Sequence, residues 1–194
     1  ERPRLCLFLL DTYVAFVIVM VGNYLFPIYV DRVLAASSDV FGQGEVVFAL
    51  GAMCAALLIP RLATHHGADR TIVVTMGLFL VGLTMLGLFA ATPLYFAALL
   101  LLGFGNAGSR VARSAVVLTL VPVNVMGRVQ MFFSAFDRLL RTILTFGATL
   151  IVARHSASLG FAGLAAILLI AFVSMLASRS SIRAAAPEAR SNLA

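Results

Sequence analysis

Six long apolar segments, separated by short polar connections, constrain this chain more than any other feature of its sequence. A helix needs about 20 mostly apolar residues to cross the hydrocarbon core of a bilayer. Segments of about that length occupy residues 5–30, 42–62, 71–91, 94–120, 129–152 and 158–177. They are too long for strands and show no sustained alternation, and helices satisfy their own backbone hydrogen bonds in lipid. The sequence therefore predicts an all-α membrane protein, with a six-helix transmembrane bundle over residues 1–178.

The composition agrees with lipid as the main solvent and argues against a soluble enzyme domain. Hydrophobic residues make up 62% of the chain and charged residues 11%, whereas soluble domains have about 45–50% and about 25%. The 14 basic residues are all arginine, and the net charge is +6. Because they are scattered singly and in pairs between apolar segments, we expect the lipid bilayer, and not nucleic acid, as the partner.

The arginines in the connections predict the orientation. Eight of them fall on one side of the predicted membrane and two on the other. The eight are Arg2, Arg4, Arg61, Arg70, Arg128, Arg179, Arg183 and Arg190, and the two are Arg32 and Arg154. Cytoplasmic loops carry an excess of Lys and Arg. We therefore predict a multi-pass protein of the cell inner (plasma) membrane with both termini cytoplasmic, and a disordered cytoplasmic tail over residues 179–194.

Three stretches carry motifs of a known family. The first is 25–30 (Leu-Phe-Pro-Ile-Tyr-Val), followed by Ser37, Ser38 and Gly42. The second is 60–70 (Pro-Arg-Leu-Ala-Thr-His-His-Gly-Ala-Asp-Arg), and the third joins 103–106 (Gly-Phe-Gly-Asn) to the pattern V-P-x-x-x-x-G-R-V at 121–129. Together they resemble the C-terminal six helices of a twelve-helix transporter of the major facilitator superfamily. The third stretch resembles the drug and siderophore exporter branch.

The second stretch resembles the cytoplasmic loop motif of that family, G-x-L-A-D-R-x-G-R-R. The matching positions are Leu62, Ala63 and Gly67. The first glycine, the aspartate and the arginine of the motif are replaced by Pro60, Thr64 and His65, and the basic position is shifted to Arg70. The resemblance thus implies a cytoplasmic loop here, with a doubtful gating role for its charges.

The resemblance also implies how such a chain works. Six helices form two inverted three-helix repeats, and the substrate site lies near the midplane, where the two halves of the transporter meet. We expect a partner in the missing N-terminal half or in a second copy of the chain. The implied function is secondary active transport, as an antiporter that couples proton entry to the efflux of small amphipathic compounds, without a cofactor. The alternatives are a non-transporting membrane interaction protein and a truncated remnant of a transporter.

Charged residues inside the fourth and fifth segments stand out. A charge near a helix centre costs about 2.5–3.5 kcal/mol on insertion, so it must be paired, reach the membrane surface or line water. Arg110 and Arg113 share one face of the fourth segment, and Arg113 is expected at the depth of Asp137 in the fifth. Asp137 can also reach Arg141 at a spacing of four. These four residues are our first candidates for a substrate or proton pathway.

Three interpretations of these charges stay open at this point. Arg113 and Arg138 can extend to the cytoplasmic headgroups. The arginines can form a cationic cavity wall that attracts an anionic substrate. Finally, Asp137 can pair with Arg110 or Arg141 in a contact that breaks during alternating access, which is the hypothesis that we favour.

Other polar residues in the helices are weaker candidates for the same pathway. Asp11, near the cytoplasmic end of the first segment, can carry a proton, contact substrate or stay hydrated at the mouth. Asn23 and Asn106 can bind substrate, but asparagine in a membrane helix more often hydrogen-bonds a neighbouring helix.

An intramembrane enzyme is not expected. A serine protease needs a His base at the depth of its nucleophile, and the histidines are His65, His66 and His155, all at loops. His65 and His66 also lack Cys or carboxylates at ligand spacing, so no metal site is predicted.

Overall fold

The computed structural model describes the backbone of residues 3–120 and 123–191 and the side chains of residues 7, 8, 10–118 and 125–178. Every element in these residues is a helix: α1 (Pro3–Arg32), α2 (Ser38–His66), α3 (Ala68–Leu88), α4 (Thr92–Leu120), α5 (Val123–Arg154) and α6 (Ala157–Ser191). Of the residues singled out above, Arg2, Val121 and Pro122 lie outside the described residues, as do the side chains of Arg4, Arg179, Arg183 and Arg190.

Five of the six helices are long and apolar enough to cross a membrane: α1, α2, α3, α4 and α6. α5 is long enough, with 32 residues, but it is not among the five. Asp137 and Arg138 lie at its middle, and Arg128, Arg141 and Arg154 add further charge. α5 is thus less apolar than the other five helices, because these charges interrupt its apolar sequence.

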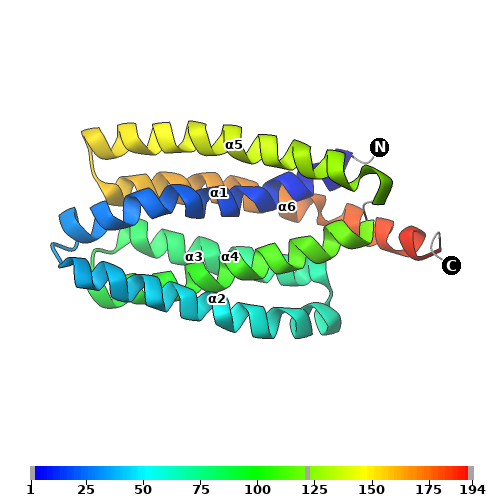
Figure 1. Ribbon diagram of the computed structural model, residues 1–194, viewed down its shortest axis with the longest axis horizontal. Coiled ribbons are helices and arrows are strands. Elements are labelled where there is room, and N and C mark those ends of the chain that lie inside the picture. The colour runs from blue at the N-terminus through cyan, green and yellow to red at the C-terminus, as the bar shows by residue number, and fades with distance from the viewer. Residues whose placement is uncertain (1–2, 121–122, 192–194) are drawn as a thin grey trace.

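The helices lie side by side in two layers (Figure 1). The first layer has the order α5, α1, α4, α2, since α1 contacts both α5 and α4, and α4 contacts α2. The second layer contains α6, which packs on α1, and α3, which packs on α4 and on α6. We call the surface of the first layer that is turned away from α3 and α6 the open face.

The packing exchanges helices between the two halves of the chain. α2 and α3 pack on α4, whereas α5 and α6 pack on α1. Each three-helix group thus contains one helix from the other half of the sequence. This arrangement is expected when a pseudo-twofold axis in the membrane plane relates helices α1–α3 to α4–α6, as the predicted inverted repeats require.

Glycines allow α4 to pack closely between α2 and α3. A Cβ added to Gly103 would collide with the backbone carbonyl of Phe48 in α2. A Cβ added to Gly105 would lie 2.6 Å from the carbonyl oxygen of Thr75 in α3. Because lipid offers no hydrophobic driving force between helices, this close backbone approach supplies the van der Waals contact that holds them together.

The predicted cytoplasmic loop between α2 and α3 is a single residue. Leu62 and Ala63 belong to the last turns of α2, and Arg70 belongs to the first turn of α3. Gly67 alone connects the helices, with φ of 86°, a value that favours glycine. Its N–H donates to the carbonyl oxygen of Ala63 at 3.0 Å, so α2 stays helical until the glycine ends it.

The predicted disordered tail also differs from the structure, since α6 continues as a helix to Ser191. Three consecutive alanines at 184–186 favour helix in this segment, because alanine has the highest helix propensity. Residues 192–194 of the predicted tail lie outside the described residues.

We predict that Gly103→Ala destabilises the bundle by about 1–3 kcal/mol, since the new methyl group meets a backbone carbonyl that cannot turn away. Gly147→Ala in α5 is the matched control, because nothing lies within 4 Å of a Cβ placed there and alanine favours helix. Thermal unfolding in detergent measures both variants. Equal midpoints for the two would contradict the packing role of Gly103.

Candidate functional site

α5 carries an apolar stripe and a polar stripe on opposite sides. Phe132, Leu139, Ile143, Phe146 and Leu150 are all exposed and recur at spacings of seven, four, three and four, which places them on one side of the helix. Polar residues recur on the opposite side, where Asp137 is buried and most of the others are half-buried: Gln130, Ser134, Asp137, Arg141 and Thr145. The apolar stripe suits lipid, so the polar stripe requires a different environment.

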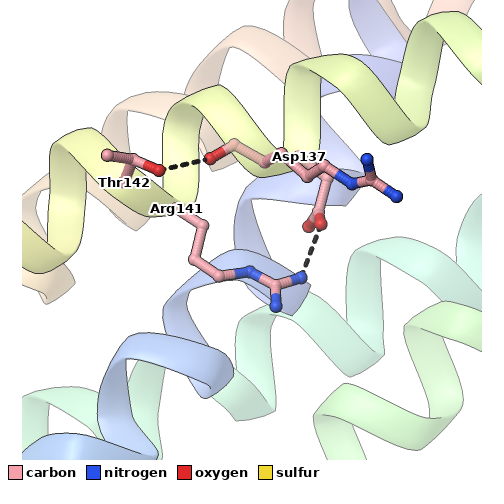
Figure 2. A network of polar contacts seen from close by, with 4 residues as sticks. Asp137, Arg141 and Thr142 are labelled. Carbon is pink, nitrogen blue, oxygen red and sulfur yellow. Dashed lines mark hydrogen bonds and ion pairs between the residues drawn. The ribbon is translucent and has the colours of Figure 1, made fainter.

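Asp137 and Arg141 form an ion pair within this polar stripe (Figure 2). Arg141 Nη2 donates to Asp137 Oδ2 at 2.5 Å, and 37% of the Arg141 side chain is exposed against 11% for Asp137. Asp137 Oδ1 and Arg141 Nε are buried and have no partner among the described residues. The pair partly offsets the cost of placing each charge within a bilayer.

Phe16 of α1 lies beside two guanidinium groups. Cζ of Arg110 is 5.3 Å from the centre of its ring, and Cζ of Arg141 is 5.8 Å from it. A guanidinium group within about 6 Å of a ring centre is attracted by the negative face of the ring. Phe16 thus gathers one arginine from α4 and one from α5 at the same place on α1.

Phe16 lies on the open face. A different side of α1 packs on α6, where the rings of Phe26 and Tyr29 contact Phe161. At 3.6 residues per turn, Phe16 is turned by about 80° from Phe26 and by about 140° from Tyr29, so it points away from α6. Arg110 is exposed, as is Asn23, which falls two turns from Phe16 on the same side of α1.

Arg113 is buried in a stack that crosses three helices. Its Cζ lies 3.9 Å from the centre of the Tyr13 ring, and that ring stacks on Phe133 of α5 with centres 4.8 Å apart. Its Nη1 donates to the carbonyl oxygen of Thr12 at 3.2 Å. Arg113 is 9% exposed, so it does not extend to the membrane surface. Since no Cα atoms of α4 and α5 lie within 8 Å of each other in the described residues, the stack links these helices through α1.

Asp11 does not belong to this cluster. Ser174 of α6 donates a hydrogen bond to its carboxylate, and Oδ2 is buried without a partner among the described residues. The side chain therefore faces the second layer, away from Phe16. Asn106 is 6% exposed and shares a face of α4 with Arg110, four residues on. Its Oδ1 has no partner in the described part of the chain.

The structure thus joins only some of the predicted site residues. Asp137, Arg141, Arg110 and Arg113 gather around α1, whereas Asp11 faces α6 and Asn23 lies nearer the other end of α1. The aromatic residues that receive the arginines, Tyr13, Phe16 and Phe133, were not predicted. Aromatic residues are common in apolar segments, so their presence alone does not indicate a site. The one feature that could have indicated these contacts is the spacing of three residues between Tyr13 and Phe16, which places both rings on the side of α1 that faces the arginines.

No metal centre is indicated in the described residues, since no three His, Cys, Asp or Glu side chains gather there. His65 and His66 are exposed in the last turn of α2.

The fold and this cluster can be compared with known proteins. No curated protein matched the chain. The family model of the Major Facilitator Superfamily matches residues 8–192, which is nearly the whole chain. The chain belongs to this superfamily. Its six helices correspond to half of the superfamily fold, and the superfamily consists of transporters and not of enzymes. The resemblance found in the sequence motifs is confirmed at the level of the family.

We predict that Tyr13→Leu lowers the stability of the bundle by about 1–3 kcal/mol, because it removes both the ring stack and the cation–π contact. The matched control is Tyr24→Leu in the same helix, since Tyr24 is 64% exposed. Thermal unfolding in detergent gives the comparison. If both variants unfold at the same temperature, the stack does not hold the three helices together.

Proposed function

We propose that this chain is the C-terminal half of a secondary transporter that exports small amphipathic compounds in exchange for protons. Membership of the Major Facilitator Superfamily supports transport of a small molecule across a lipid bilayer. The motifs at 103–106 and 121–129 favour the drug and siderophore exporter branch. The open face is the surface to which the N-terminal half, or a second copy, would bind, so that the polar side of α5 lines the pathway.

The Asp137–Arg141 ion pair is the observation that carries this proposal. It lies on the polar stripe of α5, and Arg110 and Arg141 both lie beside the ring of Phe16. A proton bound to Asp137 would remove its charge and release Arg141, and loss of the proton would restore the pair. The two states differ by one charge within the membrane. Moving one elementary charge across a membrane potential of 100 mV changes its free energy by about 2.3 kcal/mol. Proton entry can thus drive a change between two arrangements of α5.

The test uses the protein as its cells make it, in proteoliposomes with an imposed pH gradient and a panel of anionic, neutral and cationic amphipathic dyes. We expect Asp137→Asn to lower gradient-driven dye transport at least tenfold, whereas downhill exchange persists, because the asparagine cannot change charge. Asp31→Asn is the control, since Asp31 is exposed at the end of α1. The same dependence on pH in Asp137→Asn and the unaltered protein would refute proton coupling at this residue. No transport of any dye by the unaltered protein would favour a non-transporting role.

The proposed orientation places both termini in the cytoplasm, because the sequence predicts eight of the ten arginines in the connections and termini on that side. We predict that a membrane-impermeant maleimide labels Ser37→Cys in intact cells, since Ser37 is exposed between α1 and α2. His66→Cys, at the end of α2, should react only after the cells are permeabilised. Both variants are made without Cys6 and Cys54. The reverse pattern of labelling would invert the proposed topology.

A further inference from the structure

The cluster around Phe16 carries more positive than negative charge. Three guanidinium groups, of Arg110, Arg113 and Arg141, accompany the single carboxylate of Asp137. Asp11 is the acidic residue in this part of α1, but it faces α6 and accepts a hydrogen bond from Ser174. Charges within a membrane protein are paired, face water or form part of a substrate or ion pathway. The excess of positive charge therefore requires an anion.

The three arginines differ in which groups accept hydrogen bonds from them or pack against them. Arg113 is buried, bound to the carbonyl oxygen of Thr12 and covered by the ring of Tyr13. Arg141 is half-exposed and shares Asp137, and its Nε is a buried donor without a partner in the described residues. Arg110 is exposed and contacts the ring of Phe16, and no carboxylate in the described residues forms an ion pair with it. Arg110 and Arg141 can therefore accept a further anionic group, whereas Arg113 cannot.

Both of these groups lie beside the same ring. Their Cζ atoms are 5.3 Å and 5.8 Å from the centre of Phe16, so they cannot be more than about 11 Å apart. A guanidinium group is planar, presents several N–H donors and matches the shape of a carboxylate, sulfonate or phosphate. An anionic group that enters from the open face can therefore lie near both arginines, with the apolar part of its molecule beside Phe16.

From this arrangement we propose that the compounds carried by this protein are amphipathic organic anions, whose anionic group binds Arg110 and Arg141 beside Phe16. The proposal rests on the proposed transport function and names the substrate class of the same site. In it, Asp137 is a competitor of the substrate for Arg141.

Because Asp137 competes with the substrate for Arg141, the direction in which Asp137→Asn changes substrate affinity distinguishes an anionic from a cationic substrate. If an anion binds Arg141, Asp137→Asn frees that arginine and strengthens the binding of the anion. If the substrate is instead an organic cation held by Asp137, the same variant weakens its binding. A carboxylate supplied by the facing polypeptide is the other source of negative charge for Arg110. In that case Arg110→Gln lowers thermal stability and leaves the affinity for a small anion unchanged.

The experiment measures binding at equilibrium by dialysis of the purified protein in detergent. The probes are 1-naphthoate, the neutral 1-naphthamide and the cationic 1-naphthylmethylammonium, which share one ring system and differ in charge. We expect naphthoate to bind at least tenfold more tightly than the other two, as expected for charge-assisted hydrogen bonds. Arg110→Gln and Arg141→Gln should each weaken its binding at least tenfold, and Asp137→Asn should strengthen it several-fold.

Arg138→Gln is the matched control, since it removes the same charge next to Asp137 from an exposed side chain, and Phe16 forms cation–π contacts with Arg110 and Arg141 in the described residues. We expect it to change naphthoate affinity less than about threefold. Tightest binding of the ammonium probe, weaker naphthoate binding in Asp137→Asn, or equal effects of Arg138→Gln and Arg110→Gln would each overturn the proposal. Because binding is measured without transport, a protein that binds naphthoate in this pattern but moves no dye would contradict the proposed function alone.

Discussion

The absence of water from the membrane interior is the constraint on which the rest of this structure depends. Backbone N–H and C=O groups find no partner in lipid, so each apolar segment must be a helix throughout its length. Lipid also removes the hydrophobic driving force between helices. Close contact must replace it, and Gly103 and Gly105 provide that contact by letting α4 approach the backbones of α2 and α3. The position of α4, and with it that of Arg110 and Arg113, follows from this packing.

The same constraint determines where charge is tolerated. α5 is the helix that is too charged to count as an apolar span, and it separates an exposed apolar side from a largely buried polar side along its length. Its charges are received by α1, where the rings of Tyr13 and Phe16 face arginines from α4 and α5. Aromatic rings attract cations without bringing a compensating negative charge. They hold the arginines in place while the cluster stays positive overall.

The sequence predicts the parts of this molecule that depend on local spacing. The apolar segments predict the six helices to within a few residues at most ends, and the spacing of four predicts that Asp137 can reach Arg141. Two local features were misjudged: helix α2 continues to His66 because only Gly67 ends it, and α6 continues beyond 179 through alanines. The place of Phe16 beside two arginines could not be predicted, because it depends on how α1, α4 and α5 are rotated against one another. For the same reason the sequence did not separate Asp11 from the cluster.

The two groups related by the pseudo-twofold differ in how they are held together. α2 packs on α4 through glycines and backbone contact, which leaves little freedom between these helices. α5 packs on α1 less closely, and the stack of Arg113, Tyr13 and Phe133 is a main link between them. Ring and cation contacts are individually worth about 0.5–2 kcal/mol, so changes of charge of the size discussed above can compete with them. A transporter needs one side that yields while the other stays rigid. The side with α5, which also carries Asp137 and Arg141, has the weaker packing and the charges to respond.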